Sequence, residues 1–238
     1  MTGEKKAPTS KSAGEAVSSK SKKGGVTAKP VLRAVVTRGQ VPVVFLDANI
    51  LIPQYLRLVF LELAEAGVVQ IHWSDDVLIE TRRNLVKPGG RYELDAKTVE
   101  RLLVLMREHF PQALVQGYKG LKARFVGKTD AKDEHVAAAA LKRSLAISGG
   151  EAVVLVTSNI SDLPQSAFAG TLVQVCRPAR FLVELLHVEP RVAGVIDAKL
   201  RKLKSPKTSR EDFLRVMDNS QCPTFANALA AVWGLGPA

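Results

Sequence analysis

A short apolar run that stops at an acidic residue constrains this chain more than any other feature. Residues 43–46 (VVFL) carry no polar side chain, which is typical of a strand buried on both faces of a parallel sheet. Asp47 follows directly, and Asn49 comes two residues later. Because open α/β sheets bind ligands at the carboxyl ends of their strands, Asp47 is a candidate site residue. The simpler alternative is that Asp47 only caps the next helix.

Strand-like and helical segments alternate over residues 41–187. Further strands are expected at 68–73, 113–116, 152–156 and 171–175. Helices are expected at 51–66, 74–86 and 96–109, from Thr129 or Asp130 through the alanine run at 136–140, and at 178–187. Strands that alternate with helices of this length favour a parallel sheet. The expected fold class is therefore α/β, with three α/β/α layers around a central parallel sheet of about five strands.

The two ends of the chain depart from this alternation. Residues 1–40 contain nine Lys or Arg and two acids, so they hold +7 of the formal net charge of +11. Up to Lys29 they lack large apolar groups, which predicts a disordered basic tail. The tail is either an electrostatic attachment to RNA or another polyanion, or a leader without a task. Residues 188–238 are expected to form a small helical extension, with helices at 191–204, from a Thr208–Glu211 capping box to 219, and at 224–233.

Composition restricts the location of the protein. No apolar run reaches the length of about 18 residues that spans a membrane, and no signal peptide is recognisable at the start. Cys176 and Cys222 lie far apart and lack the spacing of metal ligands. Buried free thiols and a cytoplasmic location are therefore expected.

Polar groups on four separate elements are candidates for one site. Asp47 ends the first strand, Glu80 lies within the second helix, and Asp133, with Asp130 one turn earlier, begins the alanine-rich helix. Asn159 and Asp162 follow the strand at 152–156. In a parallel sheet Asp47 and the Asn159/Asp162 group share the carboxyl edge, whereas spacing does not prove that Glu80 and Asp133 join them.

Convergence of these groups would imply a cation. Clustered carboxylates repel one another and have raised pKa values unless a cation neutralises them. An oxygen-only donor set favours Mg²⁺ or Mn²⁺ over Zn²⁺. Such a site could hydrolyse a phosphodiester bond.

Each candidate also has a structural alternative. Glu80 could pair with Arg83 or Asn84 on a solvated face, Asp130 could be only a helix cap, and Asp162 could be only a turn residue before Pro164. His135 and His72 are interpreted as packing or hydrogen-bonding residues.

The pieces FLDANIL (45–51), WSDDVLIETRRNL (73–85), DAKDEHVAAAA (130–140) and VTSNISDLP (156–164) resemble, in this order, the PIN domain of VapC-type toxin ribonucleases. The resemblance covers roughly residues 41–187, and the C-terminal helices resemble those of a longer bacterial subgroup. It implies an acidic pocket for Mg²⁺ or Mn²⁺ in which Asp47, Glu80 and Asp133 are catalytic and bind metal. Asp130 is a nearby acid, and Asn159 stands where many relatives have Asp, a change for which Asp162 would compensate.

The resemblance further implies a homodimer and a neutralising antitoxin. Two functions are compared on this basis. The first is a Mg²⁺- or Mn²⁺-dependent endoribonuclease, the toxin of a toxin–antitoxin pair, and the second is a catalytically silent RNA-binding or scaffold protein. A different metal-dependent nuclease or phosphatase is a third possibility. Candidate substrate contacts of the nuclease are Asn49, Thr157, Arg82, Arg83 and Lys128, with Lys119, Lys122 and Arg124 as further cations for phosphate.

Overall fold

The computed structural model describes residues 35–147, 151–205 and 207–236. The chain divides into two units, Met1–Arg33 and Ala34–Ala238, and only the second is described. The expectation for the basic tail therefore lies almost wholly outside the described residues. From residue 35 onward the chain already belongs to the core unit, because Val36 is buried and the Val35 amide donates to Glu184 Oε2 at 2.6 Å.

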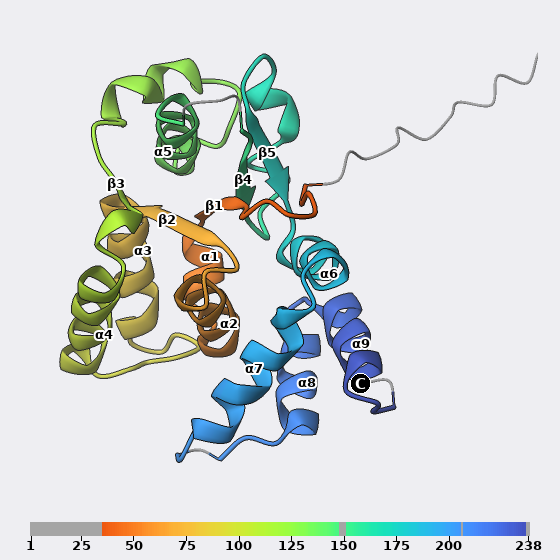
Figure 1. Ribbon diagram of the computed structural model, residues 1–238. Helices are drawn as coiled ribbons and strands as arrows, with labels where there is room; N and C mark the ends of the chain where they lie inside the picture. The colour runs from red at the N-terminus through yellow and green to blue at the C-terminus, as the bar shows by residue number, and fades with distance from the viewer. Residues whose placement is uncertain (1–34, 148–150, 206, 237–238) are drawn as a thin grey trace, which may run out of the picture. The chain divides into compact units, whose positions relative to one another are not determined.

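Five parallel strands form one sheet in the order β3-β2-β1-β4-β5, as Figure 1 shows. The strands are β1 (Val43–Leu46), β2 (Gln70–Ser74), β3 (Leu114–Val115), β4 (Val153–Val156) and β5 (Val173–Cys176). The expectation of a three-layer α/β/α fold with a parallel sheet of about five strands is confirmed.

The central strands β1 and β4 determine where a site can form. Both are apolar and fully buried, and their register pairs Leu46 with Val156. The next residues, Asp47 and Thr157, therefore leave the sheet side by side, and the Asp47 amide donates to the Val156 carbonyl at 3.2 Å. The chain continues from β1 toward β2 on one side and from β4 toward β5 on the other. This reversal of strand order is the place where open α/β sheets bind ligands.

Among the described residues, five helices cover one face of the sheet (Figure 1). They are α1 (Ala48–Leu51), α2 (Gln54–Glu65), α3 (Asp75–Val86), α4 (Ala96–His109) and α6 (Pro178–Val188). The expected single helix over 51–66 is wrong, because Pro53 separates α1 from α2. Proline donates no backbone hydrogen bond, and the extended backbone of Pro53 (ψ 122°) interrupts the helical path between them. The N-caps expected at Ser74 and Asp95 are confirmed, since each accepts from a backbone amide of its own first turn.

The opposite face carries α5 (Glu134–Leu145) and the 3₁₀ helix η2 (Lys119–Arg124), which lie above the sheet in Figure 1. The alanine run 136–140 of α5 is fully buried, so the helix packs closely on the strands. Its expected start at Thr129 or Asp130 is wrong. Residues 130–133 form a turn in which the Asp133 amide donates to the Asp130 carbonyl at 2.9 Å, and the helix begins after Asp133. Two further 3₁₀ helices are η1 (Pro111–Ala113) and η3 (Gln165–Phe168).

The C-terminal helices share the core of the sheet domain. α7 (Arg191–Lys202) packs on α2, and α9 (Pro223–Val232) packs on α6. α8 (Arg210–Asn219) begins with Ser209, whose side chain accepts from the Asp212 amide at 3.0 Å. The expected Thr208–Glu211 capping box is therefore wrong by one residue, because the Thr208 hydroxyl is buried against the Tyr55 hydroxyl at 2.8 Å.

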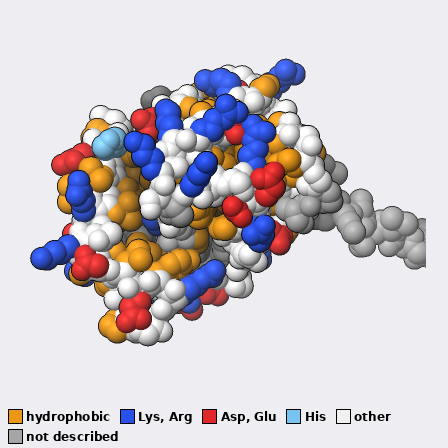
Figure 2. All heavy atoms as spheres, turned by 90° about the horizontal axis from the view of Figure 1, so that it is seen from below, with side chains coloured by type: hydrophobic (Ala, Val, Ile, Leu, Met, Phe, Trp, Pro, Cys, Tyr) orange, Lys and Arg blue, Asp and Glu red, His pale blue; other side chains and the backbone are white. Residues whose placement is uncertain are grey.

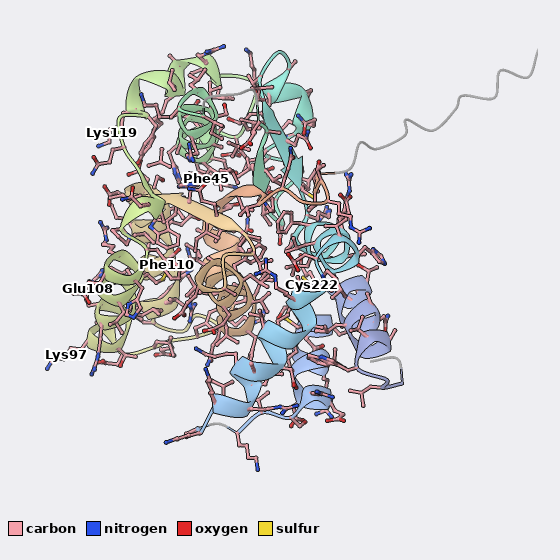
Figure 3. All side chains as sticks on the ribbon, in the orientation of Figure 1. Phe45, Lys97, Glu108, Phe110, Lys119 and Cys222 are labelled. Carbon is pink, nitrogen blue, oxygen red and sulfur yellow. The ribbon has the colours of Figure 1, made fainter. Side chains whose placement is uncertain are left out.

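Figure 3 labels two positions that mark the extent of this core. Phe45 lies at the centre of the sheet between the two helical layers, and Cys222 lies among the C-terminal helices. Both cysteines, Cys176 and Cys222, are buried free thiols, as expected. No helix in the described part of the chain is long and apolar enough to cross a membrane.

Candidate active site

Asp47 is the buried centre of a hydrogen-bond network. Its side chain is 4% exposed, and it accepts from the Ala48 amide at 2.6 Å, from the Thr157 hydroxyl at 2.7 Å and from Asn49 Nδ2. The capping alternative is thus also observed, because the Ala48 contact is an N-cap. Burial raises the pKa of Asp47, the Thr157 hydrogen bond opposes this, and the negative charge of Glu80 raises it further.

Thr157 and Asn49 brace Asp47 from within. The Thr157 hydroxyl is fully buried and accepts from Asn49 Nδ2 at 3.0 Å and from the Asn159 amide at 2.9 Å. Asn49 Oδ1 accepts from the Ser158 amide at 3.0 Å. Thr157 is predicted to contact substrate, but its hydroxyl is fully buried with three partners and orients Asp47. Asn49 is half-buried and also braces the carboxylate, but part of it stays accessible.

Asp133 meets the same network from the other face of the sheet. The Asn159 amide nitrogen donates one hydrogen bond to Asp133 Oδ2 at 3.0 Å and one to Asp162 Oδ2 at 2.9 Å. The pKa of Asp133 is raised to about 6, chiefly by burial and then by the negative charge of Asp47, with Glu80 and Asp162 adding to the effect. The turn at 130–133 therefore delivers Asp133 to the carboxyl edge, where Asp47 already lies.

Glu80 joins the site from α3 together with His135 from α5. His135 Nε2 lies 3.5 Å from Glu80 Oε2, and the negative charge of Glu80 raises the pKa values of Asp47 and Asp133. The alternative partners of Glu80 are not seen among the described side chains, since Asn84 bonds only its backbone carbonyl. His135, interpreted from sequence as structural, is thus a site residue. Its position two residues after Asp133 was the available signal.

We define the acidic centre as Asp47, Glu80 and Asp133. Lys132 neutralises the acids at its rim, Asp130 and Asp162. Its ammonium lies 3.0 Å from Asp162 and 4.0 Å from Asp130. The pKa of Asp162 is lowered by its Asn159 hydrogen bond and by Lys132. Lys132 therefore pairs directly with Asp130 and Asp162, whereas its charge only partly offsets the raised pKa of Asp133.

The expected phosphate contacts are spread out. Arg82 pairs with Glu100 of α4, while Arg83 and Lys128 are exposed without a described partner at the acidic centre. Lys119 extends from η2 to the outside of the molecule in Figure 3. On the face shown in Figure 2, Lys and Arg side chains are mixed with acids rather than gathered in one patch. Sequence reasoning missed Arg177, which follows β5 and donates to the Ser158 carbonyl at 3.1 Å.

The acidic centre fits a hard divalent cation by its chemistry. Its donors are carboxylate oxygens, the Asn159 amide nitrogen donates to Asp133 beside them, and two carboxylates have pKa values raised by burial and mutual repulsion. Within residues 35–147, 151–205 and 207–236, no three His, Cys, Asp or Glu side chains stand close enough to hold one ion together as they are. A Mg²⁺ ion that keeps several waters needs only one or two direct carboxylates. The residues therefore fit such an ion.

The burial of Asp133 and its repulsion by Asp47 predict a pH-dependent stability of the metal-free protein. The pKa of Asp133 is about 6 in the folded chain against 3.8 as its ordinary value, so the folded state holds this proton more tightly. The contribution of Asp133 to the free energy of unfolding should thus fall as pH rises from about 4 to about 6. Urea unfolding with a chelator should show the wild type losing stability relative to Asp133→Asn over this range. A constant difference between the two proteins would contradict the shift.

No protein-family model, no curated protein and no solved structure matches the chain.

Proposed function

We propose that this protein is a metal-dependent endoribonuclease that hydrolyses RNA phosphodiester bonds with Mg²⁺ or Mn²⁺. The observation that carries the proposal is the convergence of Asp47, Glu80 and Asp133 from three elements on one electrostatic centre, at the reversal point of a parallel sheet. Buried carboxylates that raise one another's pKa values destabilise the fold, and such groups cluster at functional sites. The resemblance of the four sequence pieces to the PIN domain supports RNA as the substrate.

The chain's own residues have distinct parts in this proposal. Asp47, Glu80 and Asp133 would hold the cation, with Asn159 beside them. The bound cation supplies Lewis-acid polarisation of the phosphoryl oxygen and lowers the pKa of water. Thr157, Asn49 and the Ala48 amide fix the Asp47 carboxylate. His135, next to Glu80, can exchange a proton near the reacting groups. Arg177 is exposed, donates to the Ser158 carbonyl and can contact a substrate phosphate.

The biological setting is proposed from the resemblance alone. In that setting the enzyme is the cytoplasmic toxin of a type II toxin–antitoxin pair. It acts as a homodimer and is neutralised by an antitoxin protein. Co-expression with the product of a small neighbouring reading frame tests this part separately, since a toxin should be rescued by its antitoxin and a housekeeping nuclease should not.

The nuclease proposal is tested by incubating the purified full chain with single-stranded RNA. Cleavage is expected with Mg²⁺ or Mn²⁺ and is expected to stop with a chelator. Glu80→Gln should lose activity, whereas Glu100→Gln, a matched change of an exposed acid paired with Arg82, should not. RNA binding without cleavage under all these conditions would favour the silent RNA-binding alternative.

The bracing role of Thr157 gives a more specific expectation. Thr157→Val keeps the shape of the side chain but removes the hydroxyl that donates to Asp47. Partners that orient metal ligands are typically worth about 10- to 100-fold in affinity or activity, so cleavage should fall by about that factor. Thr157→Ser, which keeps the hydroxyl, should retain most of the activity. Equal rates for the Val and Ser variants would show that the hydroxyl does not matter.

A further inference from the structure

A pocket of about 240 Å³ adjoins the acidic centre. Asn49 and Ser158, which belong to the hydrogen-bond network of Asp47, form one wall. Arg91 and Tyr92 of the loop between α3 and α4 form a second wall, and Asn219 and Gln221 of the α8–α9 turn form a third. The pocket therefore lies between the edge of the proposed catalytic centre and the C-terminal helices.

The side chains that line this pocket suit a ligand that is planar and polar. The Arg91 guanidinium lies over the Tyr92 ring, 5.6 Å from its centroid. Aromatic rings and arginine planes are the surfaces on which unpaired bases stack. The carboxamides of Asn219 and Gln221 add donors and acceptors of the kind that read base edges.

A buried cation, Arg57, lies near Tyr92. Arg57 of α2 is 7% exposed and donates to the carbonyl oxygens of Leu51 and Ile52. No carboxylate in the described part of the chain forms an ion pair with it. Burial lowers the pKa of Arg57 to about 10, and nearby Tyr92 partly opposes this. The guanidinium therefore holds the carboxyl end of α1 and adds positive charge near Tyr92.

The backbone is held in unusual conformations at the same place. Among the described non-glycine residues, Glu93 (φ 43°) and Gln221 (φ 64°) have left-handed φ values. Gln221 lines the pocket, and Glu93 follows Tyr92. At Gln221 this conformation closes the C-terminal end of α8, since the Cys222 amide donates to the Met217 carbonyl at 3.0 Å. The same cap fixes the backbone from which the Gln221 carboxamide reaches the pocket.

We propose that this pocket is a nucleobase subsite, in which one base of a single-stranded RNA stacks on Tyr92 while its phosphate reaches the acidic centre past Asn49 and Ser158. The inference rests on the proposed nuclease function and deepens it. It gives the C-terminal helices a part in choosing where RNA is cut, because the α8–α9 turn supplies the carboxamides that face the base.

The test measures RNA binding separately from cleavage. The full chain is titrated, with a chelator present, into four fluorescent single-stranded homopolymer hexaribonucleotides, one for each base. Tyr92→Ala should weaken binding by roughly 5- to 100-fold, the usual range for loss of one stacked base, and Tyr92→Phe should not. Gln221→Gly suits the left-handed backbone and removes the carboxamide, so it should change the ranking of the four homopolymers and the distribution of cut sites.

A matched control and the opposing outcomes separate this inference from the nuclease proposal. Trp233→Ala removes a second arginine–aromatic pair, Arg210 over Trp233 at 5.2 Å, and should leave RNA affinity unchanged. Unchanged affinity and cut sites in both Tyr92→Ala and Gln221→Gly, with active wild type, would overturn the subsite alone. Should Tyr92→Ala fail to fold, the Gln221→Gly result decides. Binding that depends on Tyr92 in a chain that cuts no RNA would support the subsite and reject the nuclease, and a wild type that binds no hexamer would overturn the subsite.

Discussion

Asp133→Asn is expected to reduce RNA cleavage by at least about 100-fold, because partners that merely orient metal ligands are already worth about 10- to 100-fold. The substitution keeps the shape of the side chain. Its amide oxygen can still accept the hydrogen bond from Asn159 Nδ2, and only the charge is lost. The same change removes the repulsion with Asp47 and Glu80, so the metal-free protein should become more stable at neutral pH.

The pair of readouts makes this prediction specific. A variant that loses activity by misfolding would lose stability as well, whereas Asp133→Asn should lose activity and gain stability. Such opposition between stability and function is common where an active site holds like charges. Asp130→Asn is the matched control, since Asp130 lies three residues earlier, is exposed and has Lys132 as its cation. Full cleavage by Asp133→Asn, or equal losses in both variants, would refute the role of Asp133.

Asn159→Asp should make the stability of the fold dependent on a divalent cation. The amide nitrogen of Asn159 donates to both Asp133 and Asp162, and aspartate would replace these two donors with a further negative charge. Loss of partners for buried charged groups costs about 1–3 kcal/mol, which lowers the melting temperature of a domain of this size by about 2–12 °C. Added Mg²⁺ should restore stability, because the extra carboxylate is a further ligand.

Asn159→Ala separates the two effects of that substitution. It removes the donors without adding charge, so it should be destabilised less, and Mg²⁺ should not raise its melting temperature beyond that of the wild type. Thermal melts with and without Mg²⁺ measure both variants. A melting temperature of Asn159→Asp that equals the wild type in chelator would contradict the network described for Asn159.

The sheet could be predicted because its strands depend on local composition. The runs at 43–46 and 153–156 are continuously apolar, and such runs are typical of strands buried on both faces of a parallel sheet. Asp47 was predictable for the same reason, since the end of β1 fixes its position. The missed break at Pro53 and the one-residue error at Thr208 concern helix ends, where a single residue changes the cap.

The convergence of the acids could not be derived from spacing. Whether Asp133 reaches the carboxyl edge depends on the turn at 130–133, where the Asp133 amide bonds Asp130 and the Asp130 amide bonds the Asp162 carbonyl at 3.1 Å. These contacts join segments about thirty residues apart. The pairing of His135 with Glu80 likewise depends on how α5 and α3 approach each other.

The pocket next to the acidic centre could not be predicted from the sequence. Its walls come from four segments between Asn49 and Gln221, and none of them carries a recognisable motif. The left-handed backbone at Gln221 gave no signal either, because glutamine rarely adopts it. Only the packing of α8 and α9 against the sheet domain brings these side chains together.

The central claim is that Asp47, Glu80 and Asp133 hold one cation in common. Crystals of the full chain soaked in Mn²⁺ test it directly through anomalous scattering. The account predicts a peak between these three carboxylates with Asn159 beside it, at Mn²⁺ concentrations that support cleavage. A peak found only at the Asp130 and Asp162 rim, or no peak at such concentrations, would contradict it.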